Sequence, residues 1–429
     1  MPATSQSDAR EPTHYAFIDS LRGWAILLVI LTHAAQGPVA VAALSQPPSD
    51  TIPPLTLPPW LGAITGNAGA GVQLFFVVSA FSLTLSWLSR GATAGATRRF
   101  LARRLFRIAP MYYLAIAIYL LIYGTGPRFA APRGIAPDDV LLTVTFLSVW
   151  KLNALNSVVP GDWSVGCEAT FYVLLPLLLT WLRAPRMMIG ATALLAVLTE
   201  LRMRYMIVHG LWGPLSYFQF QNQLVVFCFG VIAALLLHEP TVARWFRARR
   251  PGMALRALPL LLFAGIVAGV ALVDLPGWWV GTQMQNGILA AGLCVVLFYV
   301  PSALLVNPVM QRIGLVSFSM YLLHFCFFSL AMRLAHVGQR WAGLHGTGPG
   351  FLAVYYPILV GISFAVAWTT YHLIERPCIR LGRTVIAARL NAASPSAQPA
   401  ATGSAISTPP ARASSHAAPA DASRRANDT

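Results

Sequence analysis

Long apolar runs recur along this chain, with only short polar stretches between them. Ten of these runs approach the length of a membrane-spanning helix, which needs roughly 20 apolar residues. They fall near residues 16–35, 69–88, 109–124, 164–182, 187–201, 222–238, 257–274, 285–303, 314–334 and 351–373. Charged residues make up only 10% of the chain, compared with roughly 25% in a soluble domain. The sequence therefore predicts an all-α integral membrane protein, a bundle of about ten transmembrane helices.

The basic residues between the runs predict the orientation of the chain. When ten spans are counted, most of these residues fall on the same side as the N-terminus, and basic residues concentrate on the cytoplasmic side of a membrane. A shorter run at 139–150 would place the later basic loops outside if it were a span. We expect it to be an interfacial or re-entrant segment, with both termini of the chain in the cytoplasm.

The two ends of the chain differ in composition from the apolar part. Residues 1–14 are polar and are expected to be disordered. Residues 15–385 form the predicted transmembrane domain. Residues 386–429 are rich in Ala, Ser and Pro, a composition that cannot bury a core, and we expect a disordered cytoplasmic tail.

The net charge of +16 rests almost entirely on arginine, since Lys151 is the single lysine. In a soluble protein this balance would suggest a nucleic-acid partner. Here the arginines lie between apolar runs, so membrane topology and contacts with anionic lipid or phosphate explain them better. The five cysteines are scattered without a CxxC spacing, so we predict neither disulfides nor a metal site.

The first apolar run contains three ionisable residues, Asp19, Arg22 and His33. Arg22 and His33 lie about 20° apart around a helix axis and roughly 16 Å apart along it, so they share one face. Asp19 lies near the same stripe, and an ion pair with Arg22 is feasible. Ionisable residues in a span usually line a cavity or pathway, although an interfacial anchor with a boundary histidine explains the spacing equally well.

Two later runs also carry polar stripes. Ser164, Glu168 and Tyr172 recur every fourth residue, and Glu168 is the acidic member of its run. A carboxylate of this kind either contacts neighbouring helices or orients a catalytic histidine. In the ninth run one face presents Ser317, Tyr321 and His324. These side chains are candidates for a pore lining, with hydrogen-bonded packing as the equal alternative.

A basic ridge precedes the third run, where Arg99, Arg103 and Arg107 repeat every fourth residue beside Arg104. Arginine binds phosphate oxygens in bidentate fashion, so the ridge suits a phosphate-bearing ligand. On these residues alone, anchoring to lipid headgroups is the simpler explanation.

In order, these segments resemble the motifs of acyltransferase family 3, the membrane-bound O-acyltransferases that act on bacterial surface glycans. Residues 18–33 resemble the family's arginine, ten intervening residues and histidine, matched by Arg22 and His33. The remaining resemblances lie at 71–87, 103–113, 162–176, 221–231, 317–325 and 374–377. Where many relatives carry two consecutive acidic residues, this chain has Cys167 and Glu168, so only Glu168 corresponds.

The resemblance implies an acyltransferase of the bacterial cytoplasmic (inner) membrane that moves an acyl group, with acetyl favoured, from cytoplasmic acyl-CoA to a hydroxyl of an extracytoplasmic glycan or lipid-linked saccharide. It implies catalytic roles for His33, Glu168 and Arg22, with His33 as general base or covalent acyl carrier. It also implies that Arg22 and the ridge bind acyl-CoA through Arg103, Arg104 and Arg107. Acyl-CoA would be a substrate, with no tightly bound cofactor.

Two other classes of function fit an integral membrane protein of this kind. A transporter or flippase for a glycan or small metabolite would also line its path with polar residues. A non-enzymatic membrane partner of a glycan-assembly complex would tolerate loss of the histidine. Neither class specifically predicts the Arg22 and His33 pair together with a basic ridge.

Overall fold

The computed structural model describes eight stretches of the chain. They are residues 15–37, 55–90, 95–128, 130–213, 215–248, 252–269, 281–341 and 346–393. Every regular element in these stretches is helical, and their only extended pairing is an isolated bridge between Arg128 and Ala131. The predicted all-α class is therefore confirmed. The expectation of disorder for 1–14 and for 394–429 concerns residues outside the described part.

Seven helical segments of the described chain are long and apolar enough to cross a membrane. An eighth is added if α9 (Phe220–Leu236) and α10 (Pro240–Ala248), bent by 69°, form one span. Four of the seven are Ala16–Gln36 (α1), Ala96–Tyr123 (α5), Asp162–Trp181 (α7) and Thr282–Tyr299 (within α12, Gly281–Tyr299). The other three consist of several helices each: Pro59–Arg90 (α3, Pro59–Asn67; η1, Ala68–Ala70; α4, Gly71–Arg90), Ser317–Trp341 (α14, Ser317–Leu323; η4, His324–Phe327; α15, Phe328–Trp341) and Pro349–Ala388 (α16, Pro349–Thr370; η5, Tyr371–Glu375; and part of α17, Arg376–Ala393). The chain is a multi-pass membrane protein.

All ten predicted runs overlap helices of the described residues, but three of these helices do not form a simple span. The run at 187–201 lies in α8 (Pro185–Val208), and the run at 257–274 overlaps the shorter α11 (Met253–Ala268). The third is α9, whose bend toward α10 breaks the segment. The count of about ten spans therefore stays a prediction, as does the cytoplasmic placement of both termini.

The segment predicted to be interfacial or re-entrant forms two short helices, α6 (Pro137–Val144) and η2 (Ser148–Trp150). At 1.5 Å per residue, the eight residues of α6 are far too short to span a bilayer. Lys151 joins the segment by ion pairs to Asp138 (2.5 Å) and Asp139 (2.8 Å). The hydrogen bond to Asp138 raises the pKa of Lys151 above its ordinary value.

The expectation that the tail is disordered from residue 386 onward needs a correction for its first eight residues. Helix α17 (Arg376–Ala393) continues past that residue, so residues 386–393 are helical instead of belonging to a disordered tail. This stretch contains four alanines, one leucine and one arginine, which are strong helix formers, whereas the Pro and Ser that favour disorder become frequent only afterwards.

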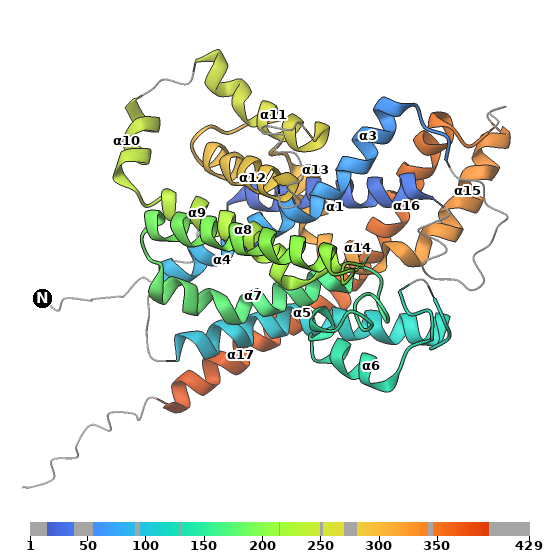
Figure 1. The fold of residues 1–429 in the computed structure, drawn as a ribbon, viewed down its shortest axis with the longest axis horizontal. Coiled ribbons are helices and arrows are strands. Elements are labelled where there is room, and N and C mark those ends of the chain that lie inside the picture. The colour runs from blue at the N-terminus through green and yellow to red at the C-terminus, as the bar shows by residue number, and fades with distance from the viewer. Residues whose placement is uncertain are drawn as a thin grey trace, which may run out of the picture. The chain divides into compact units, whose positions relative to one another are not determined.

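Helix α1 is the element around which the site is built, and it packs against α4, α13 (Pro308–Leu315) and α16 (Figure 1). Glycines permit the α1–α13 crossing: a Cβ on Gly23 would lie 2.3 Å from the carbonyl oxygen of Met310. A Cβ on Gly314 would lie only 1.8 Å from the carbonyl oxygen of Asp19. Small residues allow such close backbone approach between membrane helices. The crossing fixes the part of α1 that carries Arg22.

Helix α4 supplies the opposite wall of the site. It packs against α1, α9 and α12, and the contact with α9 is close because Gly230 has no Cβ; one would lie 2.3 Å from the carbonyl oxygen of Val77. At helical spacing, Val72, Ser79 and Ser82 fall toward one side of α4. On this side of α4, Ser82 contacts Arg22 of α1 and Ser79 contacts Glu168 of α7.

Candidate active site

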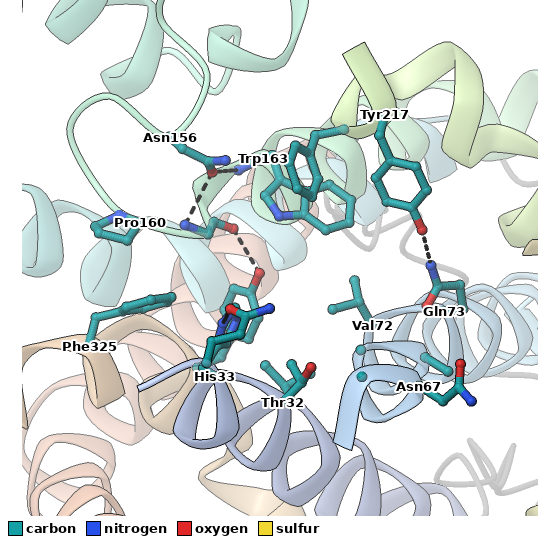
Figure 2. Close-up of a pocket in the computed structure, with 18 of the residues that line it drawn as sticks. Thr32, His33, Asn67, Val72, Gln73, Asn156, Pro160, Trp163, Tyr217 and Phe325 are labelled. Atoms are coloured by element: carbon teal, nitrogen blue, oxygen red, sulfur yellow. Dashed lines mark hydrogen bonds between the residues drawn. The ribbon is translucent and has the colours of Figure 1, made fainter. Parts of the chain in front are cut away.

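A cavity of about 410 Å³, here the histidine cavity, contains His33 in the last turn of α1 (Figure 2). His33 Nδ1 lies 3.3 Å from Oε1 of Gln36, and both residues line the cavity. An amide oxygen can only accept, so this contact makes Nδ1 the N–H donor and leaves Nε2 with a free lone pair. A half-buried neutral imidazole in this tautomer is suited to accept a proton.

His324 packs close to His33 but does not line the histidine cavity. The two imidazole centroids are 5.5 Å apart, and Phe325 lies 4.8 Å from the His33 ring. His324 is fully buried, and its Nδ1 lies 2.7 Å from the carbonyl oxygen of Tyr321, to which an N–H can donate. Its Nε2 has no hydrogen-bond partner. The break from α14 to η4 places His324 here, as a neighbour of His33 and not a wall of the cavity.

Tyr321 does line the histidine cavity, as predicted, and its hydroxyl donates to the carbonyl oxygen of Gly161 at 2.8 Å. Asn156 holds the same turn, accepting from the backbone N–H of Gly161 at 3.1 Å. Asp162, fully buried, accepts from the N–H of Asn156 (2.8 Å) and from the hydroxyl of Tyr112 (3.3 Å). This network positions one rim of the cavity, and the sequence patterns gave Asp162 and Asn156 no role.

A small central cavity of about 70 Å³ collects most of the other predicted site residues. The stripe of Ser164, Glu168 and Tyr172 faces it from α7, and Ser317 faces it from α14. Ser79 of α4 donates to Glu168 Oε1 at 2.5 Å. Ser164 and Ser317 hydroxyls donate to backbone carbonyl oxygens of Gly161 (3.1 Å) and Gly314 (2.8 Å).

The structure thus brings Glu168 to the arginines and not to His33. Glu168 lines the central cavity together with Arg22, whereas His33 makes its hydrogen bond to Gln36. The expectation that Glu168 orients His33 is therefore not met by this arrangement. The reason is the packing of the helices: Glu168 on α7 faces α4, where it accepts a hydrogen bond from Ser79.

A third cavity of about 440 Å³, here the arginine cavity, lies around the other end of the α1 stripe. Asp19 and Arg22 both line it and form the predicted ion pair, with Nη1 3.2 Å from Oδ1. Arg22 Nη2 also donates to Ser82 Oγ at 3.1 Å. From the ridge on α5, Arg104 and Arg107 reach this cavity.

Arg103, like Arg99, is a ridge residue that the structure separates from Arg104 and Arg107. It lines none of these three cavities and lies in the electrostatic field of Arg90 and Arg99 instead. Neighbouring residues on a helix point 100° apart, which explains why Arg104 and Arg103 diverge. The buried Nε of Arg104 has no hydrogen-bond partner, so its guanidinium has unused donor capacity beside the cavity.

The three cavities are linked by residues that they share. Arg22, Arg104 and Arg107 line both the arginine cavity and the central cavity. Val72 and Tyr321 line both the central cavity and the histidine cavity. Guanidinium groups that can bind phosphate therefore lie at one end of this row of adjacent cavities, and an imidazole that can accept a proton lies at the other.

Comparison with known proteins identifies the class to which this site belongs. The family model described as an acyltransferase domain matches residues 15–372, so the chain belongs to acyltransferase family 3. It is therefore a membrane acyltransferase that transfers groups other than aminoacyl groups. No solved structure matches the chain at a significant level.

Three relatives show the range of proteins to which the chain is similar. "Acyltransferase MdmB" of Streptomyces mycarofaciens is 24% identical, over 74% of this chain and 82% of its own length. "Regulator of hypoxia-inducible factor 1" of Caenorhabditis elegans is 23% identical, over 84% of this chain and 78% of its own. "Exopolysaccharide production protein ExoZ" of Rhizobium meliloti is 24% identical, over 73% and 90%.

Proposed function

We propose that this acyltransferase moves an acyl group from acyl-CoA in the cytoplasm to a hydroxyl of an extracytoplasmic glycan. The supporting observation is the row of three adjacent cavities, with arginines at one end and the imidazole of His33 at the other. In this proposal about ten helices span a bacterial inner membrane and both termini are cytoplasmic. Basic residues concentrate on the cytoplasmic side of a membrane, so the arginine cavity faces the cytoplasm.

The donor binds at the arginine cavity. Arg104 and Arg107 offer guanidinium donors to the coenzyme phosphates, and Arg22, held by Asp19, lies where this cavity narrows into the central one. Arginine pairs with phosphate through two parallel hydrogen bonds, which fixes the orientation of the donor as well as its affinity. The extended arm of the coenzyme then carries the thioester along the central cavity toward His33.

The size of the central cavity supports a short acyl group. At about 70 Å³ it is the smallest of the three cavities, so a short acyl group passes it with less displacement of the walls than a long acyl chain would require. Acetyl-CoA is accordingly the favoured donor.

Chemistry takes place in the histidine cavity. His33 Nε2 accepts the proton of the acceptor hydroxyl while the oxygen of that hydroxyl attacks the thioester carbonyl carbon. The new oxygen–carbon bond forms, the carbon–sulfur bond breaks, and the proton passes from His33 to the departing thiolate. The alternative, in which His33 carries the acyl group covalently, uses the same nitrogen as nucleophile. The acceptor is a surface glycan or a lipid-linked saccharide.

The test supplies labelled acyl-CoA and the surface glycans of the host to membranes that contain the wild-type chain or His33→Ala. Loss of a general base costs ~10²–10⁴-fold in turnover, so label is expected on the glycan with the wild type and not with the variant. His336→Ala is the matched control, because that histidine packs on Phe351 of α16 and lines none of the three cavities. Movement of the glycan across the membrane without label would instead establish a transporter.

A further inference from the structure

The walls of the histidine cavity are polar without being charged. None of the described residues that line it is Asp, Glu, Lys or Arg. Its polar groups are side-chain amides and hydroxyls, among them Gln73 of α4 and Asn286 of α12. Trp163 and Phe218, with ring centroids 4.9 Å apart, supply an aromatic wall. A volume of about 410 Å³ falls within the range of ~300–1,000 Å³ typical of small-molecule sites.

Gln73 carries an unused hydrogen-bond acceptor in this cavity. Its side chain is 4% exposed, and its Nε2 donates to the hydroxyl of Tyr217 at 2.7 Å, as Figure 2 shows. That bond fixes the amide plane and leaves Oε1, which is buried and has no hydrogen-bond partner. In Figure 2, Gln73 and Tyr217 lie on one side of the cavity and His33 and Phe325 on the other.

A buried carbonyl oxygen without a partner is costly, and a ligand O–H that donates to it removes that cost. A carboxylate or ammonium group would lose its water in this cavity without gaining an opposite charge from any described lining residue. Neutral hydroxyls suffer no such penalty, and the apolar face of a ring can lie on the aromatic wall. The cavity therefore favours many hydroxyls and no charge.

We propose that the histidine cavity selects an uncharged, polyhydroxylated ring as acceptor, and that Gln73 is a specificity-determining residue which accepts a hydrogen bond from one of its hydroxyls. This inference rests on the proposed function and adds the chemical class of its acceptor. Gln73 recognises the ring from the side opposite His33, so that a different hydroxyl of the same ring is presented to the base.

The experiment compares acceptors that differ only in charge. Purified protein in lipid nanodiscs receives labelled acetyl-CoA with pairs of glycosides, each pair being a methyl hexopyranoside and the hexuronide that carries a carboxylate at C6. Within pairs that are substrates, kcat/KM is expected to be at least roughly 100-fold higher for the neutral member, since the carboxylate finds no counter-charge.

Two substitutions of Gln73 test its role. Gln73→Leu should raise KM for the neutral glycoside by roughly 10-fold, with kcat changed by less than about 3-fold, because one hydrogen bond in the complex is lost. Gln73→Lys should lower the ratio of kcat/KM for the neutral member to kcat/KM for the carboxylate member by at least about 10-fold. Gln339→Leu is the control: Gln339 is also buried, on α15, but lines none of the three cavities and should leave KM unchanged. Retained binding of coenzyme A shows that each variant is folded.

The outcomes separate this inference from the function on which it rests. Equal transfer to both members of a pair would overturn the charge selection and leave the acyltransferase function standing. Transfer to no saccharide of either charge would overturn both. An unchanged KM in a folded Gln73→Leu protein would remove Gln73 from acceptor recognition.

Discussion

The arginine cavity and the histidine cavity are similar in volume, about 440 and 410 Å³, but opposite in character. The first is lined by an aspartate and four arginines: Asp19, Arg22, Arg90, Arg104 and Arg107. The described lining of the second has no such residue. Charge, and not size, distinguishes the two ends of the path.

This difference indicates which kind of substrate each of the two cavities can hold. A charged residue within a span costs roughly 2.5–3.5 kcal/mol on insertion scales, and here one aspartate faces four arginines, so an anionic ligand would offset the excess positive charge. In the proposed function, the phosphate groups of the donor supply that negative charge. The histidine cavity has no such charge to satisfy and matches a neutral acceptor. In the proposed function, the smaller central cavity between them keeps the two substrates apart except at the reacting atoms.

The largest effect is expected from substitutions of the arginines that line the arginine cavity. It is compared with the effect of substituting an arginine of the same ridge that does not line the cavity. Arg104→Leu with Arg107→Leu should raise KM for acyl-CoA roughly 100-fold, because charge-assisted hydrogen bonds to phosphate contribute ~1.5–3 kcal/mol each. Arg103→Leu, the neighbour that lines none of the three cavities, should change this KM less than about 3-fold. Steady-state kinetics with varied donor measures both. Equal effects from both sets of substitutions would mean that the ridge attracts the donor by net charge alone.

A smaller effect is expected from a substitution at the crossing of α1 and α13, near Arg22. Gly314→Ala should destabilise the protein by about 2 kcal/mol, because the new Cβ would lie 1.8 Å from the carbonyl oxygen of Asp19. It should also raise KM for the donor more than KM for the acceptor, since the crossing supports the arginine end. Gly190→Ala on α8, where a Cβ meets nothing within 4 Å, is the control. Thermal unfolding in detergent compares the two, and equal stability would contradict the tight crossing.

The smallest effect concerns Glu168, which the structure assigns to the arginine end. Glu168→Gln should lower kcat roughly 10-fold, by the loss of a charge that faces Arg22 at the constriction. The acidic limb of the pH profile of kcat should stay in place, because Glu168 does not contact His33. Glu200→Gln, paired with Arg204 on α8, serves as control. A displaced acidic limb would restore Glu168 as a partner of the histidine.

Much of the fold and part of the site could be predicted from the sequence, since helical periodicity determines which residues of one helix share a face. The Asp19–Arg22 ion pair and the stripe of Ser164, Glu168 and Tyr172 follow from it directly. Periodicity cannot determine which faces of different helices meet. The contact between Ser79 and Glu168 joins residues 89 positions apart, so it depends on how the bundle packs.

A second reason explains why the sequence patterns missed several residues of the site. Gln73, Tyr217 and Asn156 are uncharged, lie in apolar or loop segments, and form no stripe that a helical repeat would reveal. Asp162 is acidic but stands at the start of α7, where an acidic residue is common as a helix-terminal group. A search for isolated amides within apolar runs would have found Gln73 and Asn286.

The central claim is that one continuous path joins the donor end to the acceptor end, and Val72 lines the point where the central and histidine cavities meet. The direct test seals labelled acyl-CoA on the side of the arginine cavity in proteoliposomes, supplies acceptor on the other side, and compares wild type with Val72→Phe. We expect the larger side chain to abolish transfer while the binding of acyl-CoA stays within about 3-fold of wild type, since the plug lies beyond the arginines. Undiminished transfer by folded Val72→Phe protein would show that the acyl group does not travel along this path.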